Sequence, residues 1–129
     1  MKKNKISKNW INKQRRDIYV RQSKIEGYRS RAVYKLKEIN DKFKILRNGQ
    51  SIVDLGGAPG SWSQYLSSTL KNTKLLAIDL LEIQEIKNVK LMKGDFTDDI
   101  YKQKIKSFFN TKIDLVISDM AISEITKSI

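Results

Sequence analysis

Residues 51–65 read SIVDLGGAPGSWSQY, and this stretch decides the fold class. Its first part, Ser51–Leu55, is a short apolar run, and Gly56–Gly60 is a glycine-rich turn. From Ser61 to Leu70 the apolar residues recur at helical spacing. A strand, a glycine-rich turn and an amphipathic helix in this order are typical of a unit in which the turn lies at the carboxyl end of a parallel strand.

The rest of the chain repeats the alternation of strand and helix. Three more strands are predicted, at residues 75–78, 89–92 and 113–117, and a helix at residues 98–109 separates the last two. Short apolar strands that alternate with helices indicate an α/β fold with a parallel sheet. Doubly wound sheets commonly have about five or six strands. A fourth strand so near residue 129 therefore predicts a truncated sheet with an open apolar edge.

The segment before residue 51 has a helical pattern on a polar background. Residues 1–8 predict a mobile basic tail, and residues 9–26 predict one or two short surface helices that break at Gly27. An amphipathic helix with Ser30 as its N-cap follows, and its apolar residues are Ala32, Leu36, Ile39 and Phe43. We therefore divide the chain into a basic helical region, 1–48, and the first half of a larger domain, 49–129.

The positive charge is confined to the first part of the chain, which has a net charge of +12. Residues 1–50 hold sixteen Lys and Arg against four Asp and Glu, whereas residues 51–129 hold ten of each. An AT-rich genome would explain many lysines but not their segregation. A basic segment joined to a neutral domain is typical of a polyanion-binding arm, so nucleic acid is the favoured partner of residues 1–48.

The composition excludes several chemistries. The chain has no Cys and no His, which removes disulfides, Cys/His zinc sites, cysteine nucleophiles and Ser-His-Asp triads, and we expect no metal site. No apolar run is long enough to span a membrane, and no apolar signal segment follows the basic start. We expect a cytoplasmic protein without a membrane partner.

Acidic residues follow the predicted strands. Asp79, Asp95 and Asp119 come after the second, third and fourth strands, and the glycine-rich turn comes after the first. Open α/β sheets bind ligands beside the carboxyl ends of their strands, so these groups should lie at one edge. Asp79 lies about twenty residues after the turn, where nucleotide-binding units place an acid on ribose hydroxyls. An Asp at a strand end is also a common turn residue.

The turn lacks the usual phosphate-binding patterns. Ala58 occupies the third position, where G-x-G-x-x-G requires glycine, and no Lys follows as G-x-x-x-x-G-K-[ST] requires. Dinucleotide and triphosphate sites need these elements for their phosphates. S-adenosylmethionine contains adenosine but no phosphate, and its positive sulfonium suits a rim of carboxylates. A nucleotide-dependent oxidoreductase is the disfavoured alternative.

Five collinear motifs stand out in the chain: YRSRAVYKL at 28–36, VDLGGAPGSWSQY at 53–65, DLL at 79–81, GDF at 94–96 and SDMA at 118–121. Together they resemble the motifs of the FtsJ/RrmJ-type ribosomal RNA ribose 2′-O-methyltransferases. The resemblance extends from about residue 7 to residue 121. The sequence departs from the family at Gly57, where Ala is usual, at Ser61, where a second Gly is usual, and from Ile122 onward.

The resemblance implies a Rossmann-like S-adenosylmethionine-dependent methyltransferase fold, truncated after the fourth strand. It also implies roles for individual residues. Gly60 and Trp62 would shape the pocket for the methionine and ribose parts of the cofactor. Asp79 would hold the ribose hydroxyls, and Asp95 would hold the adenine edge. Asp119 would lie beside the reacting centre.

In such enzymes a Lys-Asp-Lys-Glu set arranges the target 2′-hydroxyl. Lys35 and Asp119 match its first two members, whereas the second Lys, taken as the base, and the Glu would lie beyond residue 129. The chain alone is therefore expected to catalyse slowly or not at all. The family suggests a uridine of large-subunit ribosomal RNA, within an assembled subunit, and a monomeric enzyme. The alternative is a truncated, non-catalytic remnant that binds RNA or cofactor.

Single residues also have plain structural interpretations. Lys35 taken alone is a solvated helix residue, and Trp62 taken alone is a core residue. Asp54 is expected to accept hydrogen bonds from the N–H groups of the glycine-rich turn. Four cations and two aromatic residues before the turn are predicted to form an RNA-facing patch: Lys24, Arg29, Arg31, Lys37, Tyr28 and Tyr34.

Overall fold

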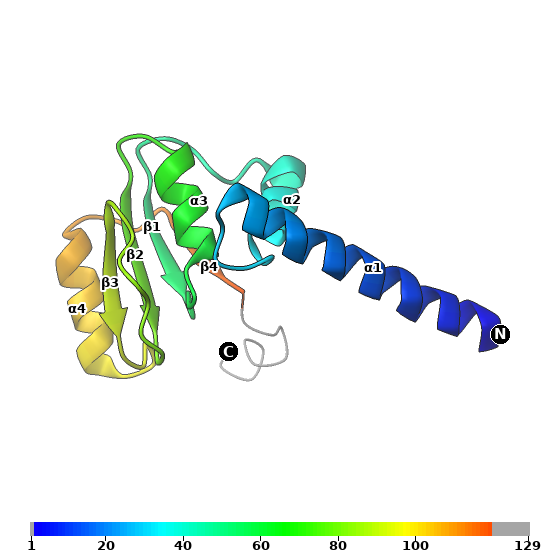
Figure 1. The fold of residues 1–129 in the computed structure, drawn as a ribbon. Coiled ribbons are helices and arrows are strands. Elements are labelled where there is room, and N and C mark those ends of the chain that lie inside the picture. The colour runs from blue at the N-terminus through cyan, green and yellow to red at the C-terminus, as the bar shows by residue number, and fades with distance from the viewer. Residues whose placement is uncertain (1, 120–129) are drawn as a thin grey trace.

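The computed structural model describes residues 2–119, with side chains from residue 8, and it has three layers (Figure 1). Helix α4 (Asp99–Phe109) covers one face of a sheet, and α2 (Val33–Phe43) and α3 (Ser61–Thr69) lie on the other face. The predicted α/β architecture is confirmed. Within the described residues the sheet has four parallel strands in the order β3-β2-β1-β4: β1 (Ser51–Leu55), β2 (Lys74–Asp79), β3 (Val89–Lys93) and β4 (Leu115–Ser118).

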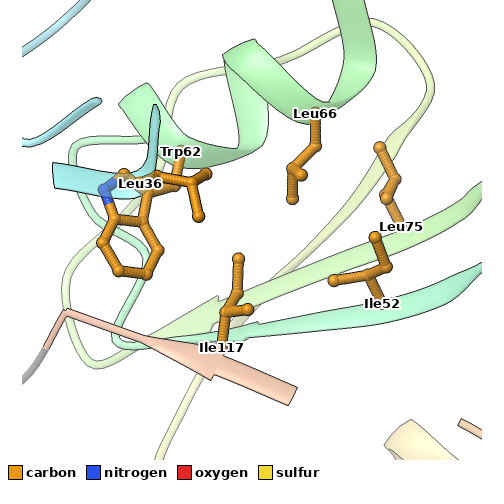
Figure 2. Packing of buried hydrophobic residues seen from close by; sticks show 6 residues of the cluster. All are labelled: Leu36, Ile52, Trp62, Leu66, Leu75 and Ile117. Carbon is orange, nitrogen blue, oxygen red and sulfur yellow. The ribbon is translucent and has the colours of Figure 1, made fainter. Parts of the chain in front are cut away.

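Apolar side chains fill the space on both faces of the sheet. Successive residues of a strand point to opposite faces, so strands covered on both sides are apolar throughout. One cluster lies between the sheet and helices α2 and α3 (Figure 2), and its buried members are Leu36, Ile52, Trp62, Leu66, Leu75 and Ile117. The second cluster includes residues of α4, and its buried members are Val53, Leu76, Ile78, Ile105 and Phe109.

The chain begins with one long helix, α1 (Lys2–Glu26). The predicted tail is wrong for residues 2–8, since the helix runs through them without a glycine or proline to stop it. The helix ends where Gly27 adopts a φ of +83°, which confirms the predicted break. Figure 1 shows α1 extending away from the sheet. None of the helices described between residues 2 and 119 combines the length and apolar character needed to cross a bilayer.

Helix α2 differs from its prediction at both ends. It begins at Val33 with Ala32 at the N-cap, and no side chain caps it. The Ser30 hydroxyl instead lies 2.9 Å from the Ser61 hydroxyl and accepts a 3.3 Å hydrogen bond from the Ala32 N–H. Phe43 is 64% exposed, so it is not a core residue. The helix buries its N-terminal half against α3, and the apolar spacing continues past the end of that contact.

The remaining elements lie close to their predicted positions. Helix α4 starts at Asp99, and the Asp98 carboxylate caps it by accepting a hydrogen bond from the Ile100 N–H. Strand β4 starts two residues later than predicted. Before it, Asp114 bonds to Ser51 through both its backbone N–H and its carboxylate. The division at residue 48 stays a prediction, although Leu36 of α2 packs in the same core as the strands.

Candidate functional site

The groups predicted to meet at one edge of the sheet do lie at that edge. The glycine-rich turn follows β1, Asp79 is the last residue of β2, and Asp119 directly follows β4. Asp95 comes two residues after the end of β3. Because all four strands are parallel, their carboxyl ends share one side of the sheet, which is where ligands of such folds bind.

Asp79 holds the glycine-rich turn in place. One of its carboxylate oxygens, Oδ2, accepts a 2.9 Å hydrogen bond from the Ala58 N–H, and the other, Oδ1, accepts a 2.8 Å bond from the Leu81 N–H. A carboxylate oxygen has two lone pairs, so both oxygens keep acceptor capacity for hydroxyl groups. The carboxylate is thus fixed in orientation and still able to bind a diol.

Two positions in the turn require glycine. Gly60 has a φ of +119°, and a Cβ there would lie 2.8 Å from Ile86 Cδ1 and 2.9 Å from Arg29 Nη1. A Cβ on Gly57 would lie 2.9 Å from Asp54 Oδ2. The family's usual Ala at that position would therefore push against a buried carboxylate. At Gly60 the turn backbone is thus packed directly against Ile86 and Arg29, which leaves no room for a side chain.

A cavity of about 180 Å³ lies between the turn, the start of α3 and the end of β4. Trp62 and Asp119 line it. Gly60 does not line it, but its neighbours in the sequence, Pro59 and Ser61, do. A larger hollow of about 690 Å³ lies near the amino ends of β2 and β3, away from the ligand-binding edge. The residues around the smaller cavity are Ser30, Ala32, Asp54, Gly56, Gly57, Ala58, Pro59, Ser61, Trp62 and Asp119.

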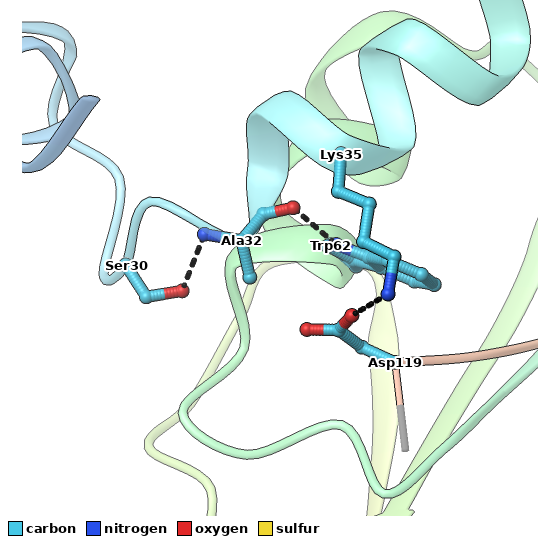
Figure 3. A network of polar contacts seen from close by, with 5 residues as sticks. All are labelled: Ser30, Ala32, Lys35, Trp62 and Asp119. Atoms are coloured by element: carbon cyan, nitrogen blue, oxygen red, sulfur yellow. Dashed lines mark hydrogen bonds and ion pairs between the residues drawn. The ribbon is translucent and has the colours of Figure 1, made fainter. Parts of the chain in front are cut away.

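The structure brings the two predicted catalytic side chains together. Lys35 Nζ, on α2, lies 3.0 Å from Asp119 Oδ1, and the two side chains are 57% and 34% exposed. Figure 3 shows Lys35 reaching from the helix toward the carboxylate at the end of β4. The pair therefore stands in solvent contact at the mouth of the cavity, where a large substrate can reach it.

Trp62 is both a core residue and a wall of the cavity. Its ring is buried in the cluster beneath α2 and α3, and its indole N–H donates a 2.7 Å hydrogen bond to the Ala32 carbonyl (Figure 3). The structural and the functional interpretations of this residue therefore do not exclude each other. Its hydrogen bond also fixes the segment that leads into the helix carrying Lys35.

Asp95 is the predicted site residue that the structure leaves apart. Its carboxylate accepts hydrogen bonds from the backbone N–H and the hydroxyl of Thr97, at 2.9 and 2.6 Å, and these bonds lower the pKa of Asp95. Neither bond joins it to another predicted site residue. Asp95 shares the ligand-binding edge, but like Asp79 it does not line the cavity beside Asp119, and unlike Asp79 it has no hydrogen bond to a residue that does.

Asp54 lies at the bottom of the cavity, and its predicted partners are wrong. The N–H groups of Gly56 and Gly57 donate to the Ile78 carbonyl, whereas the Asp54 carboxylate accepts a 2.9 Å bond from the Ser63 hydroxyl. Burial raises the pKa of Asp54 to about 7, the Ser63 bond lowers it, and the nearby carboxylates of Asp119 and Asp79 raise it. Asp54 thus keeps its proton below about pH 7, and the carboxylates that can attract a cation at this edge are those of Asp79 and Asp119.

This burial predicts how stability depends on pH. In the folded chain Asp54 keeps its proton up to about pH 7. In the unfolded chain the same carboxyl loses its proton around its ordinary pKa of 3.8. The folded state therefore binds more protons between these values, and the free energy of unfolding should fall as pH rises through that window. The stabilisation is fully present below pH 3.8, and its loss amounts to about 4 kcal/mol.

Urea unfolding between pH 4 and pH 8 measures this effect. Asp54→Asn keeps an acceptor for Ser63 but cannot titrate, so its unfolding free energy should change much less over the window. Asp41→Asn, which removes an exposed carboxylate, should behave like the unchanged chain. An Asp54→Asn variant with the pH slope of the unchanged chain would contradict the assignment.

Two of the four cations in the predicted RNA-facing patch contact their own chain. Lys37 Nζ lies 5.1, 5.2 and 5.4 Å from the ring centres of Tyr28, Tyr34 and Tyr65, and 3.3 Å from Glu26 Oε2. Such contacts hold a lysine inward by cation–π attraction and ion pairing. Lys37 thus joins the end of α1 to α2.

The second inward cation is Arg29, whose guanidinium donates to three backbone carbonyls. Lys24 and Arg31 are exposed, as the patch prediction requires. The inward roles of Arg29 and of the Ser30–Ser61 contact were missed by sequence reasoning, because backbone carbonyl partners leave no pattern in the side chains. Asp54 did carry a signal, since it is the one charged residue in a strand that is otherwise buried and uncharged.

Comparisons with known proteins were made on the whole chain. Residues 28–129 match the FtsJ-like methyltransferase family. The chain is 60% identical over 123 residues to the ribosomal RNA large subunit methyltransferase E of Pelagibacter ubique (strain HTCC1062), covering 95% of the chain and 61% of that protein. It is 44% identical over 123 residues to the protein of the same name from Legionella pneumophila (strain Corby), covering 94% and 60%.

A solved structure agrees with these sequence relations. The chain superposes on the crystal structure of a ribosomal RNA methyltransferase from Plasmodium falciparum with a TM-score of 0.67 at 36% sequence identity. The match covers 74% of this chain and 57% of that one. The chain thus spans about three fifths of the length of the curated relatives it matches.

Proposed function

Because the chain belongs to the FtsJ-like methyltransferase family, we propose that it forms the cofactor-binding part of a ribosomal RNA ribose 2′-O-methyltransferase. The methyl donor is S-adenosylmethionine, and the target is a uridine of the large-subunit RNA within an assembled subunit. The enzyme acts in the cytoplasm as a monomer. The observation that carries this proposal is the Lys35–Asp119 pair at the mouth of an acidic, glycine-lined cavity.

The residues at the sheet edge fit this cofactor. A ligand would contact the turn at Gly56, Gly57 and Ala58, which line the cavity, whereas Gly60 is packed against Ile86 and Arg29. The carboxylates of Asp79 and Asp119 at this edge favour the positive sulfonium over a phosphate. The cavity of about 180 Å³ is smaller than a typical ligand pocket of about 300–1,000 Å³, so it would hold only the methionine end. Asp79 would then bind the ribose hydroxyls, and Asp95 the adenine edge.

When bound, S-adenosylmethionine supplies an electrophilic methyl group. The protein must then align the ribose hydroxyl with that methyl and remove the hydroxyl proton as the O–C bond forms and the C–S bond breaks. Lys35 carries only donors, so it holds the hydroxyl oxygen, and Asp119 orients Lys35 from 3.0 Å. The proton itself passes to a base that the family supplies from beyond the matched segment.

Transfer of a labelled methyl group tests the proposed function. Residues 1–129 would be fused to the remaining C-terminal part of the Pelagibacter ubique relative and given undermethylated large ribosomal subunits. We expect label in a 2′-O-methylated uridine, recognised because its 3′ phosphodiester resists alkaline hydrolysis. Label on a base would contradict the proposed reaction. Cofactor binding without transfer by the fusion would favour the alternative, a non-catalytic remnant.

The basic region 1–48 is proposed to face the RNA. Within α1 the side chains from residue 8 to residue 18 are all exposed, and they include four Lys and Arg against one Asp. We expect the RNA affinity of the chain to fall steeply with salt, by roughly 10²-fold or more between 50 and 200 mM, because bound cations release counterions. Filter binding across that range measures the slope. An RNA affinity that does not change with salt concentration would contradict the electrostatic role of this region.

A further inference from the structure

The short segment between α1 and α2 is bonded directly to the glycine-rich turn. Arg29 Nη1 donates to the carbonyl oxygens of Pro59, at 3.0 Å, and Gln84, at 2.7 Å. Its Nη2 donates to the carbonyl oxygen of Glu85 at 2.8 Å. One guanidinium therefore bridges two loops: the turn after β1 and the connection between β2 and β3.

The shape of the guanidinium matters for this bridge. It presents five N–H donors in a rigid planar fork, whereas a lysine ammonium is a single point with rotating donors. Arg29 Nη1 also lies 2.9 Å from where a Cβ on Gly60 would stand, so the group packs closely against the turn backbone. A lysine at position 29 would keep the charge but could not reach all three carbonyls in the same geometry.

The backbone around Arg29 is fixed as well. The Arg29 N–H donates a 2.9 Å hydrogen bond to Gln64 Oε1 on α3. The next residue, Ser30, contacts the hydroxyl of Ser61 at 2.9 Å. Both α3 partners lie in the first four residues of the helix that follows the turn. Helix α3 therefore fixes the backbone that carries Arg29, while the guanidinium of Arg29 binds the two loops.

We propose that Arg29 is a positioning residue that fixes the cofactor turn. By joining Pro59 to Gln84 and Glu85, it holds the turn 56–60 against the connection that begins directly after Asp79. The turn and the Asp79 carboxylate, which bind the same cofactor from two strands, are thereby kept in register. This role rests on the proposed function for its cofactor, and it replaces the predicted contact of Arg29 with RNA.

Hydrogen–deuterium exchange of the free chain tests the bridge without any cofactor. In Arg29→Gln we expect the amides of residues 56–58 and of Gly60 to exchange about tenfold faster than in the unchanged chain, while those of α4 keep their rates. Arg47→Gln, which removes an exposed arginine before β1, is the matched control and should leave both regions unchanged. Unchanged exchange in the turn of Arg29→Gln would overturn the proposal.

Calorimetric titration with S-adenosylmethionine tests what the bridge does. We expect Arg29→Gln to raise the dissociation constant roughly tenfold, and Arg29→Lys to recover little of the loss. Full recovery by Arg29→Lys, or unchanged affinity with a loosened turn, would overturn the positioning role. If the unchanged chain binds no S-adenosylmethionine, the proposed function fails while faster exchange still supports the bridge. Should Arg29→Gln not fold, Arg29→Lys carries both measurements.

Discussion

Replacing Asp79 by alanine is expected to weaken S-adenosylmethionine binding by about 100-fold or more. In the proposed complex its carboxylate accepts hydrogen bonds from two ribose hydroxyls, and bonds to a charged acceptor contribute about 1.5–3 kcal/mol each. The same carboxylate holds the N–H groups of Ala58 and Leu81, at 2.9 and 2.8 Å. The variant thus loses both the ligand contact and an anchor of the turn.

Calorimetry on purified variants measures this effect, and two further variants separate its causes. Asp79→Asn keeps acceptor capacity toward the Ala58 N–H, so its affinity should fall between those of the unchanged chain and Asp79→Ala. Asp99→Ala removes a carboxylate whose side chain is 93% exposed, and we expect unchanged affinity. Binding by Asp79→Ala within about twofold of the unchanged chain would refute the assigned role.

Replacing Lys35 by alanine should have the opposite pattern: normal cofactor affinity with methyl transfer lowered by about 10²- to 10⁴-fold. The Lys35 side chain is 57% exposed and does not itself line the cavity, although its partner Asp119 does. Its removal should therefore leave the fold and the pocket intact. What is lost is the donor that orients the ribose hydroxyl for displacement, a contact that counts only when substrate is present.

The transfer assay uses the fusion with the Pelagibacter ubique relative, because it supplies the parts that the chain does not cover. The loss should be in kcat rather than in KM for S-adenosylmethionine. Lys112→Ala is the matched control, since Lys112 is an exposed lysine outside the basic region 1–48. An equal loss of cofactor affinity in Lys35→Ala and Asp79→Ala would contradict the separate roles assigned to them.

The fold could be predicted where local pattern and burial agree. The strand at Ser51–Leu55 matches its prediction at both ends. A short, mostly apolar run between Gln50 and a glycine-rich turn is typical of a strand that is covered on both faces. The position of Asp79 at the carboxyl end of a neighbouring strand follows from the parallel order of the sheet. By contrast, Lys35 and Asp119 are 84 residues apart. No spacing rule joins them, and only the family resemblance predicted that they act together.

Other features depend on tertiary contacts that no local pattern encodes. Phe43 continues the apolar spacing of α2 but lies beyond the part of the helix that packs. Helix α1 runs as one helix from Lys2, although its sparse apolar residues indicated only one or two short helices from residue 9. Arg29 binds carbonyl groups, which every residue has. Its role could be recognised only after the two loops were placed beside each other.

Calorimetric titration of the unchanged chain tests whether the carboxylates at the sheet edge bind a sulfonium cofactor. One titration uses S-adenosylmethionine and a separate one uses a nicotinamide dinucleotide. We expect saturable heat with S-adenosylmethionine at one site per chain and none with the dinucleotide. Saturable binding of the dinucleotide, with no heat from S-adenosylmethionine, would contradict it.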